Sequence, residues 1–310
     1  MQLRMFQVDV FADRTFGGNP AAVVLLDGDW LPDEVLQAVA AENHLAETAF
    51  VAPAGAAPVA AATVEAGPRY GLRWFTPTTE VELCGHATLA AGYVVLRYLD
   101  CDASSVSFST RWAGDLRVDR ERARHLTAAL PLDPPRGPSA LEVAAAVAAA
   151  LGAQPVEVVD AAATIARFST AAEVAALDPD FRALGALATP WVVATAPGTG
   201  EHQDHDWVCR YFAPGSGIDE DHVTGSAQTY LAPYWWPELD VPDGHRASAR
   251  QLSPRGGTLL VRRSETPAGP VVLVTGEVAD YLEGTITFPM PDDAVEPPVA
   301  RDRKFGGDPR

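Results

Sequence analysis

Alternating hydrophobic and polar positions predict strands along most of the chain. Residues 4–12 and 21–26 carry apolar runs on either side of a turn rich in glycine, asparagine and aspartate, which is typical of an early strand pair. Similar short runs predict further strands at residues 47–51, 106–109, 115–118, 156–159, 164–168, 191–194, 207–212, 271–276 and 284–288, and residues 251–261 predict a Gly-Gly-containing turn that leads into a strand.

Fewer segments have the spacing of helices. Pro32 and the acids after it predict a helix start, and that helix extends to about residue 42. Ser139 and Glu142 form a capping-box pattern at the start of an alanine-rich helix ending at residue 151. Small-residue runs predict helices from about 85 to 98 and 225 to 236, with short helices within 171–186. Because strands outnumber helices and no dinucleotide or Walker loop is present, we predict an α+β fold.

The segment from Arg73 to Ala91 has an echo from Arg210 to Ala232. Both read arginine, aromatic, phenylalanine, any residue, proline, and then an acidic loop that leads into a glycine-containing turn. The matched pairs are Arg73 and Arg210, Phe75 and Phe212, Pro77 and Pro214, Gly85 and Gly225, and Ala87 and Ala227. This repetition predicts two pseudo-symmetric halves, each a curved, barrel-like sheet around a central helix, with the active site in the cleft between them.

The proline-rich stretch at 131–138 is the best boundary between these halves. We therefore predict one half at residues 1–130 and the other at 131–275, with residues 276–310 as a candidate to complete the first. The Ala/Pro/Val/Gly segment 52–66 is expected to form a hairpin with a mobile tip.

Composition narrows the possible partners. The 310 residues carry a net charge of −18, which argues against nucleic acid as a partner, and no apolar run is long enough to span a membrane. The chain begins with a strand pattern rather than a leader, so we expect a cytoplasmic protein. Three cysteines without paired spacing indicate neither a disulfide framework nor a zinc site, and no metal is expected.

The Cys84–Gly85–His86 turn is the main candidate for chemistry. A strand-to-helix turn leaves backbone N–H groups free, and these groups and the helix macrodipole favour an anion. Here a thiol and an imidazole flank such a turn. Glu47 has small and apolar neighbours, but a solvated glutamate at a strand edge fits its local sequence equally well. A cysteine at such a turn, like Cys84, is more often a small buried residue than a nucleophile.

Five blocks of the chain resemble the PhzF-like isomerase family of phenazine biosynthesis, in family order. They are FGGNPAAV from Phe16, LAETAF from Leu45, RWFTP from Arg73, CGHAT from Cys84 and DHVTGSA from Asp221. The resemblance implies a diaminopimelate-epimerase-like fold and proton transfer without a cofactor, usually in a homodimer.

The same resemblance implies roles for individual residues. Glu47 takes the position of the family's general acid/base, and His86 and Asp221 match polar residues that hold the substrate and assist proton movement. The substrate-binding turns correspond to Cys84, Gly85, Thr224, Gly225 and Ser226. The chain departs from the isomerase at Ala46, where the isomerase has serine, and at His222, where many members have proline.

These residues predict an isomerase that acts on a small amino- or hydroxy-acid-like carboxylate. Glu47 would remove a proton from carbon and return it at another carbon, while both glycine turns hold the substrate carboxylate. One alternative is an epimerase, racemase or dehydratase that uses Cys84, although its mirror residue Thr224 has a hydroxyl that is a far weaker acid than a thiol. The other is a non-catalytic protein that binds a small metabolite in the same cleft.

Overall fold

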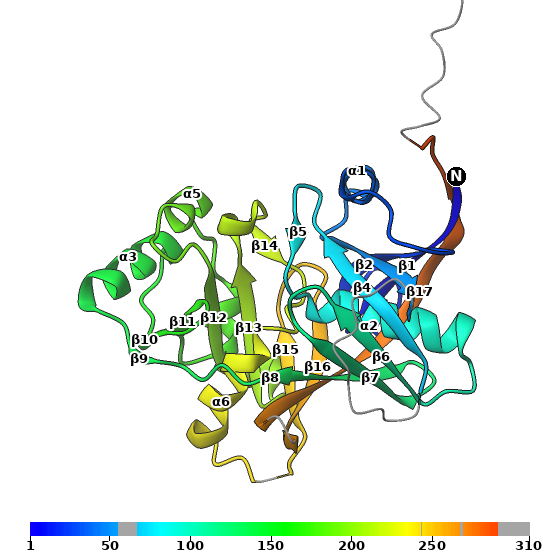
Figure 1. Ribbon diagram of the computed structural model, residues 1–310. Helices are drawn as coiled ribbons and strands as arrows, with labels where there is room; N and C mark the ends of the chain where they lie inside the picture. The colour runs from blue at the N-terminus through cyan, green and yellow to red at the C-terminus, as the bar shows by residue number, and fades with distance from the viewer. Residues whose placement is uncertain (55–66, 243, 267–268, 291–310) are drawn as a thin grey trace, which may run out of the picture.

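The computed structural model describes residues 1–54, 67–242, 244–266 and 269–290. The predicted hairpin tip near residue 60 lies outside these ranges. The fold is of the α+β class, as predicted, and Figure 1 shows its two lobes side by side. No helix in the described ranges is long and apolar enough to cross a membrane.

A closed ring of strands forms the first half. Neighbours pair in the order β1–β2–β3–β4–β6–β7–β8–β17, and β17 pairs with β1 to close the ring. The strands are β1 (Gln2–Val10), β2 (Asn19–Leu25), β3 (Glu47–Pro53), β4 (Arg69–Phe75), β6 (Ser105–Thr110), β7 (Asp115–Arg122), β8 (His125–Pro131) and β17 (Gly269–Thr287).

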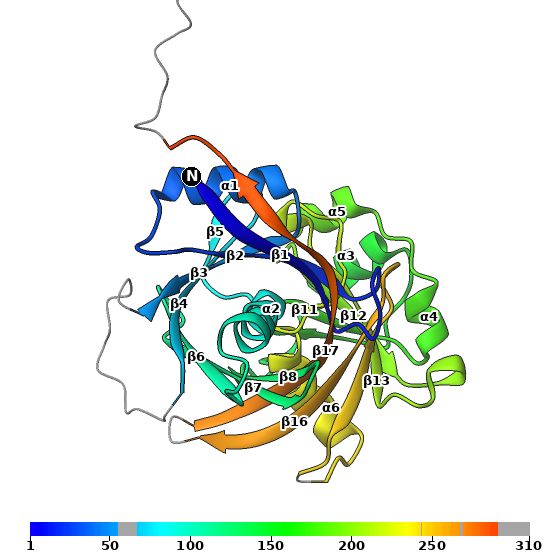
Figure 2. The same cartoon turned by 90° about the vertical axis from the view of Figure 1, so that its right-hand side faces the viewer.

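Helix α2 (Gly85–Val94) lies inside this ring, as Figure 2 shows. Every residue of α2 is buried, and its small side chains let the strands approach closely. A Cβ atom on Gly92, for example, would lie 2.5 Å from Val118 Cγ1. A π-helical turn, Val95–Leu99, continues the helix. The uninterrupted apolar and small-residue run therefore reflects a helix that is enclosed on all sides.

The second half repeats the strand senses of the first. β10–β11 is antiparallel, β11–β12 parallel, β12–β13 antiparallel, β13–β15 parallel and β15–β16 antiparallel, which is also the order from β1 to β7. The elements are β9 (Gly137–Pro138), β10 (Glu157–Asp160), β11 (Thr164–Arg167), β12 (Val192–Pro197), β13 (Trp207–Phe212), β15 (Ala247–Gln251), β16 (Gly257–Thr266) and helix α6 (Gln228–Glu238). The predicted pseudo-symmetry is thus present in the topology.

Strand β17 joins the two halves. It is a single strand of 19 residues that pairs with β16, β8 and β1, so the prediction of separate strands at 271–276 and 284–288 was wrong. Gly276 looks like a strand end in the sequence, but the ring of Phe11 lies where its side chain would be, 2.4 Å from an ideal Cβ. The domain boundary at residue 131 stays a prediction; β8 ends there, at Pro131.

Outer helices cover the sheets. Leu36 of α1 (Asp33–Asn43) packs with Val24 and Phe50 in a separate core on the outside of the first half. The outer helices of the second half are α3 (Leu141–Leu151), α4 (Ala171–Ala175) and α5 (Phe181–Gly185). The capping box predicted for α3 was wrong: the N-cap is Ala140, and the Ser139 hydroxyl donates to Asp160 Oδ1 instead.

Candidate active site

The first predicted turn links the short strand β5 (Glu80–Val81) to α2. Cys84 is the N-cap of α2 and has extended backbone angles, with φ −139°. Its carbonyl accepts the Thr88 N–H at 3.1 Å and the Thr88 hydroxyl at 2.6 Å. Cys84 and His86 are therefore held on the first turn of a buried helix.

The second turn follows the short strand β14 (Glu220–Asp221). Helix α6 begins at Gln228, three residues after the predicted start, so that boundary was wrong. The Gly225 carbonyl accepts the Gln228 N–H at 3.2 Å, which closes a tight turn ahead of the helix. The physical reason is that Gly225 and Ser226 belong to this turn, although they share the sequence pattern of a helix start.

The two turns pack directly against each other. An ideal Cβ on Gly85 would lie 3.5 Å from the Ser226 nitrogen, and one on Gly225 would lie 3.9 Å from the His86 nitrogen. Within the described ranges, the N–H groups of these four residues form no hydrogen bond. Glycine at both turns therefore brings two sets of free backbone donors together, an arrangement that suits an anion.

Glu47, His86 and Cys84 form a row. Glu47 starts β3, and its Oε2 lies 3.2 Å from His86 Nε2, close enough for an ion pair. On the other side of the imidazole ring, Nδ1 lies 3.5 Å from Cys84 Sγ. His86 and Cys84 are buried, and Glu47 is partly exposed at the outer end of the row.

This row also resembles a set of metal ligands, since one ligand atom from each residue can be chosen with all separations within 4.8 Å. The ring nitrogens, however, face different partners: one faces the carboxylate and the other the thiol. A metal-bound imidazole coordinates one ion through one nitrogen. The arrangement therefore fits a proton relay through the ring better than a shared cation.

The ionisation of this row follows from burial and close negative groups. Burial raises the pKa of the Cys84 thiol above its ordinary value of 9.0, and Glu47 raises it further, so the thiol keeps its proton at neutral pH. Burial by itself lowers the pKa of His86, but the Glu47 carboxylate, whose Oε2 lies 3.2 Å from Nε2, opposes this effect and raises the pKa above the ordinary 6.5. A protonated imidazole beside a carboxylate is the expected neutral-pH state.

Asn19 connects the two halves at the site, and sequence reasoning missed this role. Its side-chain nitrogen donates to Asp221 Oδ1 at 2.8 Å and to the Val223 carbonyl at 2.9 Å, and it lies 3.4 Å from His86 Nδ1. Asn19 is fully buried at the start of β2, where every other residue is apolar. A polar residue heading such a strand was the signal that could have revealed it.

Gln251 is a second functional residue missed from the sequence. It is fully buried at the end of β15 and accepts the Thr224 N–H at 2.8 Å. Its amide nitrogen donates to the Asp221 carbonyl at 2.8 Å. The Thr224 hydroxyl in turn donates to Asp221 Oδ2 at 2.5 Å, so the predicted residues Asp221 and Thr224 are held in one network.

Buried polar atoms without hydrogen-bond partners gather here. Within the described ranges they include Asn19 Oδ1, Glu47 Oε2, His86 Nε2 and His222 Nδ1. Such atoms are costly unless a ligand or water pairs with them. The site is therefore suited to a polar ligand.

Known proteins resemble the chain over nearly its whole length. The family model described as phenazine biosynthesis-like protein matches residues 8–284. An uncharacterized isomerase of Pseudomonas aeruginosa is 41% identical over 287 residues, covering 92% of this chain and 99% of the relative. The human phenazine biosynthesis-like domain-containing protein is 34% identical over 304 residues, with 93% and 100% covered.

Solved structures show the same similarity. A phenazine biosynthesis protein of the PhzF family from Enterococcus faecalis has a TM-score of 0.79 and 34% identity, covering 93% of this chain and 100% of that one. A hydroxyproline epimerase from Agrobacterium vitis, with a TM-score of 0.51 and 10% identity over 92% of each chain, shares the fold alone.

Proposed function

Because the chain belongs to the phenazine biosynthesis-like family, which includes proteins named as isomerases, we propose that it is a cofactor-independent isomerase. Its substrate would be a small amino- or hydroxy-acid-like carboxylate, and Glu47 would move a proton between two carbons of that molecule. The observation that carries this proposal is the row of Glu47, His86 and Cys84, in which Glu47 Oε2 and His86 Nε2 are 3.2 Å apart and lack hydrogen-bond partners.

The chemistry begins with the substrate carboxylate at the two turns. Free N–H groups at Gly85, His86, Gly225 and Ser226 would bind it and stabilise the negative charge that develops when a neighbouring carbon loses its proton. Asp221 would orient a substrate amine or hydroxyl group, because Asn19 and the Thr224 hydroxyl hold its carboxylate in one position.

Glu47 then acts as the base. It removes the proton, and the imidazolium of His86 stabilises the charge on the conjugated intermediate. The carboxyl group is partly exposed and exchanges its proton with water, and it then returns a proton at another carbon on the same face of the substrate, so a single base is sufficient. Cys84 keeps the ring in place through Nδ1 and remains a neutral thiol.

Hydrogen exchange in deuterated water tests the proposal. The wild-type chain should introduce deuterium into a substrate from a panel of small amino and hydroxy acids, and Glu47→Gln should abolish the exchange while still binding the molecule. Glu42→Gln, which removes an exposed glutamate on α1, is the matched control and should exchange as the wild type does.

Other outcomes select the alternatives. Tight binding without exchange in the wild type would indicate a non-catalytic metabolite-binding protein. Exchange that survives in Glu47→Gln but disappears in Cys84→Ser would instead indicate an epimerase or dehydratase that uses the thiol. The homodimer implied by the family resemblance is part of the proposal and is tested by light scattering.

A further inference from the structure

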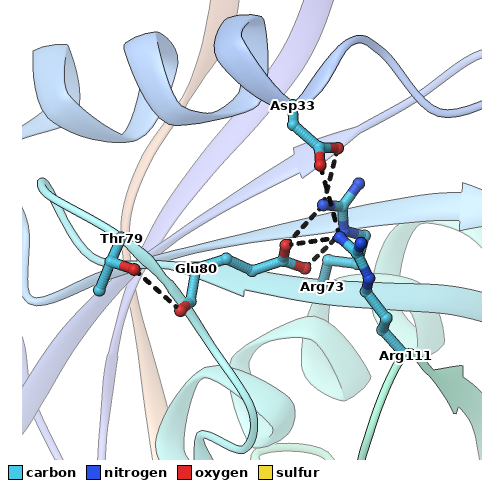
Figure 3. Close-up of polar contacts among 5 residues, drawn as sticks. All are labelled: Asp33, Arg73, Thr79, Glu80 and Arg111. Atoms are coloured by element: carbon cyan, nitrogen blue, oxygen red, sulfur yellow. Dashed lines mark hydrogen bonds and ion pairs between the residues drawn. The ribbon is translucent and has the colours of Figure 1, made fainter.

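An arginine and a glutamate join neighbouring strands ahead of the first turn. Arg73 of β4 pairs with Glu80 of β5 through two bonds of 2.6 Å, Nε to Oε1 and Nη2 to Oε2, as Figure 3 shows. The side chains are only 8% and 12% exposed. Arg73 Nη2 also donates to Asp33 Oδ1 at 2.9 Å, which ties the pair to the start of α1.

The second half contains the same pair with the same atoms. Arg210 of β13 donates through Nε and Nη2 to the two carboxylate oxygens of Glu220 on β14, each at 2.8 Å, and both side chains are 11% exposed. Its Nη1 donates to the Leu177 carbonyl at 2.6 Å, just after α4. In each half, therefore, one arginine connects an outer helix, a long strand and a short strand.

Both pairs lie the same number of residues before a site turn in the sequence. Cys84 is four residues after Glu80, and Thr224 is four residues after Glu220. The strands that contain these glutamates, β5 and β14, are only two residues long, and each has only two residue pairs with its neighbour. So short a strand is weakly held by its own backbone hydrogen bonds.

We propose that these two Arg–Glu pairs, the first bracket (Arg73–Glu80) and the second bracket (Arg210–Glu220), are positioning devices for the two site turns. The first bracket sets the position of Cys84, Gly85 and His86, and the second sets that of Thr224 and Gly225. The inference rests on the proposed function only in treating these turns as the site. The experiment below requires no turnover, so its failure would leave the proton-transfer proposal standing.

A contribution to global stability alone is the competing explanation. Buried ion pairs are weak evidence for stability, since apolar residues often replace them without loss, but a bidentate pair fixes geometry strongly. Positioning predicts that breaking one bracket loosens its own turn and leaves the other in place. Global stabilisation predicts that both turns loosen together.

The reaction rates of the three cysteines can measure the exposure of each half of the site separately. Cys84 lies in the first turn and is buried, Cys209 is buried on β13 beside Gln251, and Cys101 is exposed and serves as the internal reference. Iodoacetamide labelling of the full chain at pH 8, followed by peptide mass spectrometry, gives a rate for each thiol. A buried thiol reacts only when its cover opens.

The expected result is a half-specific change. Glu80→Gln should increase the Cys84 rate at least tenfold relative to Cys101 and change the Cys209 rate less than twofold. Glu220→Gln should have the opposite pattern. The matched control is Asp115→Asn. It breaks the ion pair between Asp115 and Arg69, a residue that is also on β4 but outside the two positions, Trp74 and Phe75, that pair with β5.

Charge needs its own control at the second bracket. Burial, which is the larger cause, and the charge of Glu220 together raise the pKa of Cys209 to about 12. Removing the Glu220 charge would therefore speed Cys209 labelling even if the bracket had no positioning role. Arg210→Gln keeps that negative charge and removes the bracket. Positioning predicts faster Cys209 labelling in this variant, whereas a pure charge effect predicts slower labelling.

If Glu80→Gln does not fold, Asp33→Asn replaces it, because Asp33 is exposed and supports the first bracket from outside through its ion pairs with Arg73 and Arg111. Cys84 labelling should then rise about threefold, with Cys209 unchanged. Equal acceleration of both buried cysteines in any single-bracket variant, or no acceleration of the cysteine in the same half, would overturn the proposal.

Discussion

Replacing Asn19 with aspartate places a second carboxyl group against Asp221. The amide nitrogen that donates to Asp221 Oδ1 at 2.8 Å and to the Val223 carbonyl at 2.9 Å becomes an acceptor oxygen facing two acceptors. The position is fully buried, so water cannot relieve the contact. The change alters charge and hydrogen bonding while it keeps the size of the side chain.

The magnitude has an upper limit set by protonation. Two unit charges about 2.8 Å apart at an effective dielectric constant of about 20 repel by about 6 kcal/mol. Protonating one carboxyl with an ordinary pKa of about 3.9 costs only about 4 kcal/mol at pH 7, so the pair keeps one proton instead. The His86 imidazolium, with Nδ1 3.4 Å from the replaced nitrogen, attracts the new carboxylate and offsets part of this cost. With about 1 kcal/mol for the lost bond to Val223, the loss in Asn19→Asp should therefore not exceed about 5 kcal/mol at pH 7.

This loss depends on pH with a definite sign. The introduced carboxyl group has a folded-state pKa above its unfolded value, so its unfavourable effect is absent below about pH 4 and grows as the pH rises. Urea unfolding of the variant and the wild type should therefore differ by about 1 kcal/mol at pH 4 and by more, up to about 5 kcal/mol, at pH 7.

Asn19→Ala is the control, because it removes the same donors without adding charge. It should lose about 2–3 kcal/mol at every pH. If the two variants lose the same stability at pH 7, or if the loss in Asn19→Asp does not change with pH, Asn19 does not donate to Asp221 as described.

Two further predictions concern the packing of Gly276 against Phe11 and the ionisation of Cys84. Gly276→Ala should lose about 1–3 kcal/mol, because its Cβ would lie 2.4 Å from Phe11 Cδ1, and Phe11→Leu should restore part of that loss in a double-mutant cycle; simple additivity would argue against the contact. Cys84→Ser should make the free energy of unfolding fall less steeply with pH above about 9. The folded thiol has a raised pKa, so the wild type loses about 1.4 kcal/mol per pH unit as the pH rises above its ordinary 9.0, and equal slopes in the two proteins would contradict this.

Strands and helices with strong local patterns were predicted well, and elements defined by distant partners were not. The strand over 207–212 and the helix from Asp33 have the predicted positions within a residue or two. β8, with the sequence HLTAALP, was missed because its alanines carry no strand signal; one partner, β7, directly precedes it, and the other, β17, lies more than a hundred residues later. Similarly, Ser139 has a capping pattern, but its hydroxyl donates to Asp160 of β10 and does not cap the helix.

The sequence by itself determined the two-half plan, the enclosed helix and the family, because each depends on patterns that are local or repeated. Only the tertiary structure decided how the site is assembled: Asn19 meets His86 across 67 residues and Asp221 across 202. No local preference specifies such contacts, since a buried amide will donate to whichever acceptor the packing brings within reach. The roles of Asn19 and Gln251, and the matching of the two Arg–Glu pairs, therefore became visible only when the strands were in register.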